Sequence, residues 1–393
     1  MHKPGILLLN DFASGGGAEV VFNKTIALLK ENYDVHVYTA MNNIGDKRAG
    51  PLSYIFSIKH KNRIISIIKQ NSIRLIHVHN FRWLSPSVFY AVKKLRRLPE
   101  FEDLKLIVTT HDFSLIYPNS NFGFYKNGML TMLDTEKPKP SYLFKRLDNN
   151  GILHSLLKKI QWTVAFKLLQ LQKQINTVIS PSNFLKKAIQ LNYPYLKYKV
   201  VYNPYDAAGI AAASKIVKQP IKLVFIGRLA PEKGLLVLCD MLGKLKNKLL
   251  FTFDIYGDGP ELSFIKQTIE ENNLKGIVNL KGFLHAKQIH ETLSNYDALI
   301  MSSLCYENAP LSIIEAAFAN LQIIVPAIGG MKEMAELTGN YFFYEQYNVE
   351  SLKETINNCM HQQFNNSYLP HLKSLFSSEN YKKELISIYR NYN

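Results

Sequence analysis

Short apolar runs alternate with helical patterns along most of the chain, and this alternation limits the possible folds more than any other feature. In the first half, apolar runs such as Ile6–Asn10 and Leu106–Thr110 are each followed by a polar loop. The second half repeats the order, with strands expected over Lys222–Ile226 and Leu250–Tyr256. Strands that alternate with helices predict parallel sheets with crossover helices. We therefore expect an α/β protein with two doubly wound domains.

A chain breaker separates the two halves of this pattern. Asn203-Pro204 follows an expected strand, and the small-residue stretch 207–214 comes before the next one. The predicted domains are therefore residues 1–203 and residues 204–378, and a helix over about residues 379–393 is expected to pack back on the first domain.

The two halves differ in charge. The chain has 47 Lys and Arg against 31 Asp and Glu, a formal net charge of +16. Residues 1–200 carry 29 basic and 12 acidic residues, whereas residues 201–393 carry 18 and 19. Compositional drift toward lysine would enrich both halves, so the difference favours a functional basic surface in the first half. Such a surface suits an anionic membrane or an anionic substrate.

Several classes of protein are excluded by composition. A hydrophobic content of 47% is enough for a full core, so general disorder is not expected. No apolar run reaches the ~18 residues of a spanning helix. The cysteines, Cys239, Cys305 and Cys359, are far apart and lack metal-ligand spacing, so neither a disulfide framework nor a zinc site is expected. A cytoplasmic protein fits best.

The strongest candidate ligand loop runs from Gly227 to Gly234. It follows an expected strand and precedes an expected helix, which is where ligands bind in open parallel sheets. Arg228 and Lys233 lie on this loop, and two cations at an amide-rich turn suit a diphosphate. A solvated basic turn is the alternative.

Two carboxylates belong to a second candidate site. Glu307 lies on a loop, and Pro310 is placed to open a helix. Glu315 follows among apolar residues, where a carboxylate is costly unless it has partners. Ligand hydroxyls are suitable partners. Alternatively, Glu315 pairs with an internal basic residue and Glu307 is a cap.

With two further glycine motifs, Gly257-Asp258-Gly259-Pro260 and Gly329-Gly330, these loops resemble the donor half of glycosyltransferase family 4. The resemblance implies retaining enzymes of the GT-B fold, in which two Rossmann-like domains face each other across a cleft. Motifs of the first half are similar to those of the family's N-terminal domain: Gly15-Gly16-Gly17-Ala18-Glu19, His77-Val78-His79-Asn80, Thr110-His111-Asp112-Phe113, Ser180-Pro181-Ser182-Asn183-Phe184 and Tyr202-Asn203-Pro204.

The resemblance implies a role for each matching residue. Arg228 and Lys233 would hold the nucleotide diphosphate and stabilise the leaving group. Glu315 would accept hydrogen bonds from the ribose, and Glu307 and His111 would contact the donor sugar. The remaining implied donor contacts are Gly16, Gly17 and Gly257 at the phosphates, Phe283 and Leu284 near the base, and the amides of Pro310, Leu311 and Ser312 at the distal phosphate.

No metal cofactor is expected, because the charges of Arg228 and Lys233 would make a metal ion at the diphosphate less necessary and no Asp-x-Asp motif occurs. The co-substrate would be a nucleotide sugar with UDP or GDP. His77 and His79 alternate on one strand, so a metal pair is conceivable, but no third ligand is evident. One of them is expected in the core and the other near the cleft. His111 could alternatively cap the end of its strand.

The acceptor is the least determined partner. Relatives with a similar His-Asp motif often carry cysteines in the next loop, but 117–150 contains none. The segment 117–160 is interpreted as a long insertion or lid. A glycan or lipid-linked glycan acceptor in lipopolysaccharide or capsule synthesis is expected. The alternatives are a nucleotide-sugar 2-epimerase, a phosphorylase, a non-catalytic nucleotide-sugar-binding partner and a nucleic-acid-binding protein, although no nucleic-acid-binding module is visible.

Two basic amphipathic stretches suggest docking on the inner face of the cytoplasmic membrane. Lys93-Lys94-Leu95-Arg96-Arg97 ends a helix that also carries Phe89 and Val92, and Lys158-Lys159-Ile160-Gln161-Trp162 opens a stretch with Phe166 and Leu169. Cations beside an apolar stripe suit an anionic lipid surface. An ordinary core-facing helix with a solvated basic edge is the alternative.

Overall fold

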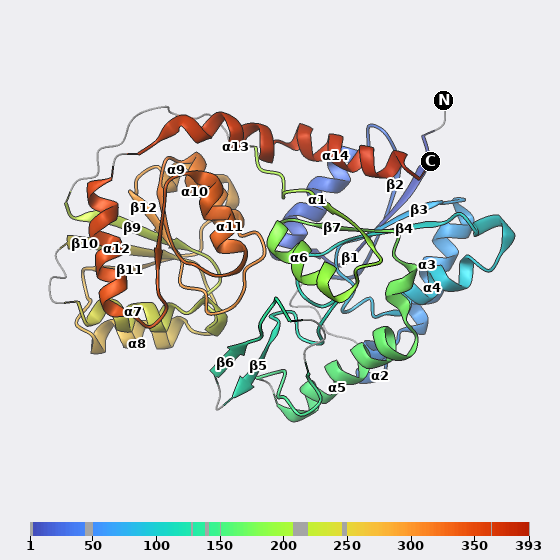
Figure 1. The fold of residues 1–393 in the computed structure, drawn as a ribbon, viewed down its shortest axis with the longest axis horizontal. Coiled ribbons are helices and arrows are strands. Elements are labelled where there is room, and N and C mark those ends of the chain that lie inside the picture. The colour runs from blue at the N-terminus through green and yellow to red at the C-terminus, as the bar shows by residue number, and fades with distance from the viewer. Residues whose placement is uncertain are drawn as a thin grey trace. The chain divides into compact units, whose positions relative to one another are not determined.

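The computed structural model describes residues 3–43, 50–126, 129–137, 141–149, 151–206, 219–245, 250–362 and 364–392. The chain divides into two compact units (Figure 1). Unit 1 consists of Met1–Pro204 and Ser378–Asn393, and unit 2 of Tyr205–Ser377. The boundary falls beside the chain breaker Asn203-Pro204.

Unit 1 is built on a six-stranded sheet with the order β2-β1-β3-β4-β7-β8. Every neighbouring pair is parallel. The strands are β1 (Gly5–Ser14), β2 (Asp34–Asn43), β3 (Leu75–Val78), β4 (Lys105–Thr109), β7 (Thr177–Ser180) and β8 (Lys197–Val200). The strands β3 and β7 are buried throughout, as expected for parallel strands covered on both faces.

Helices of unit 1 cross between these strands. They are α1 (Gly17–Leu29), α2 (Pro51–Ile55), α3 (Ile58–Gln70), α4 (Ser87–Leu95), α5 (Ile152–Trp162) and α6 (Asn183–Asn192). Because β2 and β3 lie on opposite sides of β1, right-handed crossovers put α1 and α3 on opposite faces of the sheet.

The C-terminal helix α14 (Ser378–Arg390) also belongs to unit 1. The Tyr381 hydroxyl lies 2.8 Å from the Thr25 hydroxyl of α1. The Tyr389 hydroxyl lies 2.7 Å from Nδ1 of His77 on β3. Both contacts are buried, so α14 completes the core of unit 1 although unit 2 precedes it in sequence.

Unit 2 repeats the architecture with the strand order β11-β10-β9-β12-β13-β14. Its strands are β9 (Ile221–Ile226), β10 (Phe251–Tyr256), β11 (Val278–Gly282), β12 (Ala298–Ile300), β13 (Gln322–Pro326) and β14 (Tyr341–Tyr344), and they are also parallel. Its helices are α7 (Leu235–Gly243), α8 (Leu262–Glu271), α9 (Ile289–Leu293), α10 (Leu311–Phe318), α11 (Gly329–Thr338), α12 (Val349–His361) and α13 (Leu369–Phe376). The predicted α/β class with two parallel sheets is therefore confirmed.

The segment 117–160 is more regular than predicted. It contains an antiparallel hairpin, β5 (Gly123–Lys126) with β6 (Met129–Met132), and α5 begins at Ile152. The hairpin was not predicted, because strands of four residues with mixed side chains give no clear periodicity, and the interpretation of the segment as an insertion or lid stays a prediction. Parts of this segment, residues 127–128, 138–140 and 150, lie outside the described residues.

The first predicted membrane-docking stretch faces the core. Phe89, Val92 and Leu95 of α4 are buried at 0–1% exposure. Arg96 donates hydrogen bonds to the carbonyl oxygens of Leu104 (2.8 Å) and Gln174 (2.9 Å). The prediction of a lipid-facing apolar stripe on this helix was therefore wrong, because the stripe is buried, with Phe89 against the rings of Phe81 and Phe166, and Arg96 is used internally.

Candidate active-site residues

Three loops at the carboxyl ends of β9, β10 and β12 meet in unit 2. In the sheet, β9 lies between β10 and β12: Phe225 of β9 is opposite Ile255 of β10, and Leu223 of β9 is opposite Ala298 of β12. The loops that follow these strands therefore lie side by side. The amide of Leu229 donates to the carbonyl of Asp258 (2.9 Å), and the amide of Leu304 donates to the carbonyl of Glu232 (2.9 Å). The candidate ligand loop is thus tied to both neighbours.

Glycines allow this close approach. A Cβ at Gly257, whose φ is +150°, would lie 1.8 Å from the carbonyl oxygen of Gly227. A Cβ at Gly234, whose φ is +67°, would lie 2.2 Å from the carbonyl oxygen of Ser302. Neither side chain can be accommodated, so the loop geometry requires glycine at both positions.

Lys233 and Glu307 form a buried ion pair at the centre of these loops. Nζ of Lys233 lies 2.5 Å from Oε1 of Glu307, and their side chains are 23% and 17% exposed. Ser303 donates its hydroxyl to the same carboxylate at 2.7 Å. Burial would raise the pKa of Glu307, but the Lys233 ammonium outweighs it and the pKa is lowered. Burial would likewise lower the pKa of Lys233, but Glu307 holds it above its usual value. Both groups are therefore charged at neutral pH.

Arg228 takes a different position from Lys233. Its guanidinium pairs with Glu232 one turn along the same loop, and its side chain is 63% exposed. The structure thus brings both predicted diphosphate cations to one loop, but Lys233 is inside the site and Arg228 is at its solvent edge.

Glu315 lies on α10, the helix that Pro310 precedes as the N-cap residue. Among the described residues, its carboxylate has no hydrogen-bond or ion-pair partner. Burial raises the pKa of Glu315 to about 7. The alternative in which an internal basic residue pairs with Glu315 is wrong, since the lysine pairs with Glu307 instead. The carboxylate is left available to a ligand.

The remaining predicted residues of unit 2 surround these groups. Leu311 and Ser312 form the first turn of α10, where backbone amides lack intrahelical partners. Phe283 and Leu284 follow β11, and Phe283 is 69% exposed. Gly330 was not assigned a role from the sequence. Its amide donates to the Glu307 carbonyl at 2.7 Å, and a Cβ there would lie 1.9 Å from the Asn308 carbonyl oxygen.

Unit 1 has its own pocket of about 330 Å³ at the carboxyl ends of β1, β3 and β4. Predicted residues that line it are Gly16 and Gly17 at the start of α1, and His111 after β4. A Cβ at Gly17 would meet no atom within 4 Å, so this backbone borders open space. The amide of Gly16 donates to the Glu19 carboxylate at 2.8 Å.

Three histidines lie in a row beneath this pocket. Nδ1 of His79 lies 3.0 Å from Nε2 of His111, and both residues line the pocket. His77 instead bonds Tyr389 and Thr109 inside the core. His77 is therefore the core histidine of the prediction and His79 lines a pocket of unit 1, while the position of His79 near the cleft stays a prediction. Burial lowers the pKa of His77 to about 3 and that of His111 to about 4, so the rings are neutral at neutral pH.

Two pocket residues were missed from the sequence. Asp11 lies in the last part of β1 and accepts hydrogen bonds from the backbone amides of Arg82 (2.8 Å), Trp83 (2.8 Å) and Leu84 (2.9 Å). Burial raises the pKa of Asp11 to about 6 despite these bonds. Arg82 lines the pocket with Asp11. The available signal was a charged residue within a few positions of the end of an apolar run, two residues after Leu9 for Asp11 and four after Val78 for Arg82.

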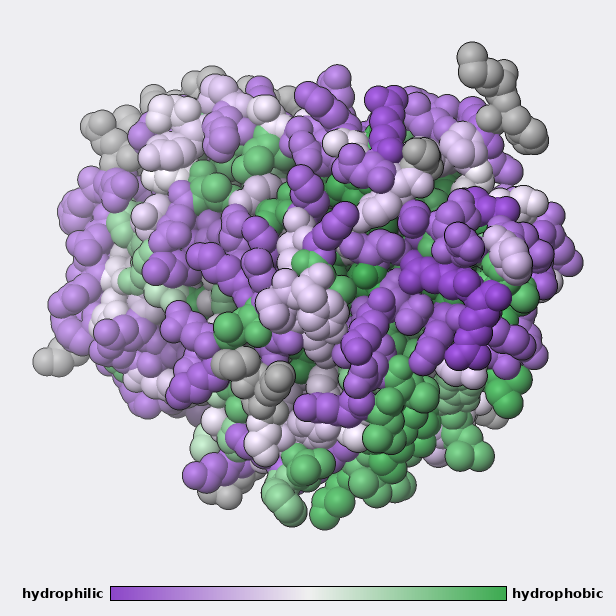
Figure 2. Space-filling model, turned by 45° about the vertical axis from the view of Figure 1, so that its right-hand side comes forward, coloured by the Kyte–Doolittle hydropathy of each residue, from purple (hydrophilic) through white to green (hydrophobic). Residues whose placement is uncertain are grey.

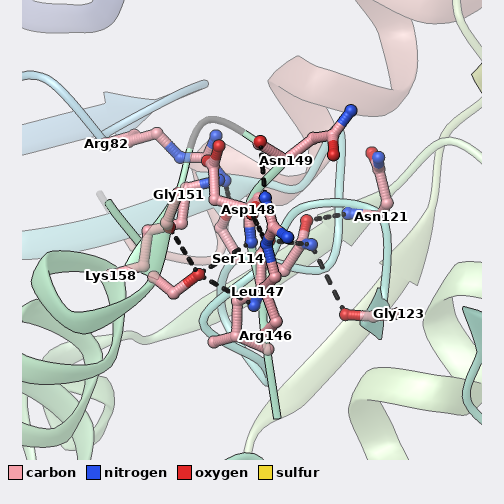
Figure 3. A network of polar contacts seen from close by, with 12 residues as sticks. Arg82, Ser114, Asn121, Gly123, Arg146, Leu147, Asp148, Asn149, Gly151 and Lys158 are labelled. Carbon is pink, nitrogen blue, oxygen red and sulfur yellow. Dashed lines mark hydrogen bonds and ion pairs between the residues drawn. The ribbon is translucent and has the colours of Figure 1, made fainter. Parts of the chain in front are cut away.

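A polar network attaches the 117–160 segment to this side of unit 1 (Figure 3). Asp148 pairs with Lys158 at 2.5 Å, and its charge also acts on Arg82. The Ser155 hydroxyl accepts from the amides of Leu147 (3.1 Å) and Asp148 (3.0 Å). The segment therefore contributes charge to the pocket's surroundings.

No group of three or more His, Cys, Asp or Glu side chains is arranged to hold a metal ion in the described part of the chain. The pair His77 and His79 has no third ligand there. At the unit 2 loops, positive charge comes from Lys233, from Arg228 at the solvent edge and from the amides at the start of α10.

Two family profiles together match most of the chain. The profile described as "Glycosyltransferase Family 4" matches residues 14–208, and that described as "Glycosyl transferases group 1" matches residues 208–372. A phosphatidylinositol N-acetylglucosaminyltransferase GPI3 subunit of Saccharomyces cerevisiae (strain RM11-1a) is 30% identical over 166 residues. The match covers 40% of this chain and only 35% of the yeast subunit.

Solved structures resemble the chain over nearly its full length. The apo form of the lipopolysaccharide outer core galactosyltransferase WaaB has a TM-score of 0.68 at 16% identity, covering 98% of this chain and 99% of that one. Anabaena HepE in complex with UDP and glucose has a TM-score of 0.62 at 15% identity, covering 99% and 100%. At such identities the likeness concerns the fold, and it confirms the predicted GT-B fold.

Proposed function

Because the chain belongs to glycosyltransferase family 4, we propose that it transfers a sugar from a nucleotide-sugar donor to a glycan acceptor with retention of anomeric configuration. The observation that carries the proposal is the pair of buried groups in unit 2. Lys233 is charged inside a glycine-shaped loop, and Glu315 is a partly buried carboxylate with no hydrogen-bond or ion-pair partner among the described residues. A cation for a diphosphate and an acceptor for ribose hydroxyls are the two groups that binding a nucleotide sugar requires.

The activation free energy of this reaction comes mainly from the separation of charge between the sugar and the departing diphosphate, and such a site has to lower it. The bond between the sugar C1 and the phosphate oxygen breaks, and a bond forms between C1 and an acceptor oxygen. The acceptor proton passes to the departing diphosphate on the same face. Lys233 stabilises the charge that grows on the diphosphate, while Glu307 keeps Lys233 in position and protonated. Arg228 adds positive charge from the solvent edge.

The acceptor side is proposed to be the pocket of unit 1. His111 is neutral there, and both His111 and Asp112 border the pocket that would receive the acceptor. The WaaB similarity supports an acceptor in cell-surface polysaccharide synthesis, such as lipopolysaccharide or capsule. HepE is solved with UDP and glucose, which supports a UDP-sugar as the first donor to test.

The proposal predicts metal-independent binding of one diphosphate nucleotide. A thermal-shift panel of UDP-, GDP- and ADP-sugars, each with excess EDTA and with added Mn²⁺, should give a shift for one base that EDTA leaves unchanged. The reason is that Lys233 supplies the charge a metal would otherwise supply. Radiolabelled transfer to a glycan extract would follow with the donor identified. A shift that requires Mn²⁺ would overturn metal independence, and no shift with any donor would overturn the function.

We further propose that the protein binds the inner face of the cytoplasmic membrane, through α2, α5 and the residues before α5. No helix in the described ranges is long and apolar enough to cross a bilayer. Figure 2 shows a hydrophobic area over the lower part of unit 1. The apolar side chains exposed by 48–98% on these elements are Leu52, Leu143, Phe144, Ile152, Leu153 and Leu156.

Charge makes an anionic lipid surface the best occupant of this area. Residues 141–173 carry six basic residues and one acidic residue, Asp148, which pairs with Lys158. Residues 50–70 carry four basic residues and no acidic one. Each basic residue near an anionic surface contributes about 1 kcal/mol. The second predicted stretch was wrong in its apolar residues, since Trp162 and Phe166 are 8% and 4% exposed. The surface proposed here uses different residues, at the start of α5 and before it.

Vesicle sedimentation tests this surface. Wild-type protein should bind vesicles containing phosphatidylglycerol at low salt, and binding should fall at 1 M salt, where the Debye length is about 3 Å. Replacing Phe144, Ile152 and Leu153 by serine should abolish binding. Phe264→Ser, which changes an aromatic residue of unit 2 that is 58% exposed, is the matched control. Equal binding by the triple variant would overturn this surface, and a monomer–dimer shift would assign it to a second copy.

A further inference from the structure

A second pocket of unit 1 shares no lining residue with the pocket that contains His111. It encloses about 310 Å³ between the end of α5, the turn Leu171–Gln174 and the residues that follow α6. Its aromatic lining consists of Tyr142, Trp162, Phe166, Tyr193 and Tyr195. None of these residues has a role in the function proposed above.

Three of the aromatic side chains that line the pocket are held in place by hydrogen bonds of their polar atoms. The Tyr142 hydroxyl lies 2.9 Å from the Thr163 hydroxyl. Trp162 donates its indole N–H to the Ser114 carbonyl at 3.1 Å, and Tyr193 donates to the Leu115 carbonyl at 3.2 Å. With their polar atoms engaged, these rings offer fixed apolar surface, which is what the C–H face of a sugar ring packs on.

A buried amide oxygen in the same pocket lacks a partner. Gln172 is 6% exposed, and its Oε1 has no hydrogen-bond partner among the described residues. Leaving such a group unpaired inside a protein is costly. A ligand hydroxyl would donate to this oxygen, whereas an aliphatic chain would leave it unpaired.

The charges that line the pocket are all positive. Lys167 and Lys173 are exposed lining residues, and none of the described residues that line the pocket is Asp or Glu. Nζ of Lys167 lies 5.8 Å from the centre of the Trp162 ring. Two ammonium groups beside aromatic surface and amide groups suit a sugar that carries a carboxylate.

We propose that this pocket binds an acidic sugar residue of a glycan, at a site separate from both candidate active-site regions. The sugar ring lies against the aromatic wall, a hydroxyl donates to Gln172, and Lys167 and Lys173 face the carboxylate. Its biological role rests on the proposed function, in which a growing glycan is the acceptor. Such a site would hold the glycan while its end is extended.

Saturation-transfer NMR with methyl β-D-glucuronide and methyl β-D-glucoside tests the site directly. Wild-type protein should transfer saturation to the glucuronide more strongly than to the glucoside. Tyr195→Ala should lower glucuronide affinity about tenfold, by removing an aromatic contact. Lys173→Ser should remove the preference for the glucuronide over the glucoside. Gln172→Leu should weaken the binding of both glycosides. The matched controls are Tyr347→Ala, at a tyrosine of unit 2 that is 62% exposed, and Lys94→Ser, at an exposed lysine of α4.

The results of these binding experiments distinguish a failure of the proposed sugar pocket from a failure of the proposed donor site. Absence of saturation transfer from wild-type protein, or the same signal in Tyr195→Ala, would overturn the proposal. The proposal would also be overturned if wild-type protein bound decanol and not the glycosides, and if Gln172→Leu strengthened decanol binding. That result would show that the pocket is apolar. Nucleotide binding in the same samples should survive Tyr195→Ala. If no nucleotide binds wild-type protein, the donor proposal fails while the glucuronide result still decides this pocket.

Discussion

Replacing Lys233 with methionine is expected to lower the rate of sugar transfer about 100- to 1,000-fold, the usual cost of removing one group that stabilises charge in a transition state. Lys233 is the buried cation of the unit 2 loops, whereas Arg228 is largely exposed. The variant should also lose much more affinity for the nucleoside diphosphate than for the bare nucleoside. Initial rates and isothermal titration calorimetry measure the two effects.

The Lys233→Met substitution leaves the Glu307 carboxylate without its ion-pair partner. Removing one member of a buried ion pair costs about 3–5 kcal/mol, because Glu307 would remain charged and unpaired. The double variant Lys233→Met/Glu307→Gln keeps the site neutral and should recover stability but not activity. Lys244→Met removes an exposed lysine of unit 2 and serves as the control. Equal loss of nucleoside and nucleoside diphosphate affinity would contradict the diphosphate role.

Replacing Glu315 with glutamine is expected to reduce transfer about 100-fold and to stabilise the fold at the same time. Burial raises the pKa of this carboxyl from 4.5 to about 7. A raised folded-state pKa contributes stability that is fully present below the unfolded value and is lost as the pH rises through about 7. The cost of ionisation above pH 7 is about 3 kcal/mol, at 1.36 kcal/mol for each pKa unit.

Urea unfolding at pH 4.5 and pH 8 measures this difference. Glu315→Gln should be more stable than wild type at pH 8, and this advantage should disappear at pH 4.5. Glu336→Gln, at an exposed residue of α11, should show no such change. A gain in stability with a loss of activity is typical of a group retained for ligand binding. Equal stability of Glu315→Gln and wild type at pH 8 would contradict a buried unpaired carboxylate.

Nucleotide binding should also release a proton near pH 7. Ribose hydroxyls that donate to the Glu315 carboxylate favour its charged form and lower its pKa. Titration calorimetry in buffers of different ionisation enthalpy would detect the released proton as part of the same measurement.

Much of the site could be predicted because its signals are local. The order of strand, loop and helix follows from apolar periodicity. Arg228, Lys233, Glu307 and Glu315 were found because charged side chains in or beside apolar segments are conspicuous in a sequence. Asp11 and Arg82 were missed because each is a single polar residue, one within β1 and one in the loop after β3, and their relation depends on β1 and β3 being neighbours.

The amphipathic helices show where local patterns are insufficient. The helices α4 and α5 both combine cations with an apolar stripe, yet the stripe of α4 is buried while Ile152 and Leu153 of α5 are 81% and 66% exposed. Sequence periodicity places apolar side chains on one face of a helix. It does not say whether a sheet or solvent lies opposite that face.

The sequence by itself determined the α/β class, the family and the groups that carry charge at the donor loops, because these depend on periodicity and on spacing within short segments. The tertiary structure alone decided how these groups are paired. It joined Lys233 to Glu307, 74 residues away, and left Glu315 alone. It also placed His77 in the core against Tyr389, 312 residues away, and His79 at the pocket. Such contacts arise only when distant strands and helices pack, and no local pattern encodes that packing.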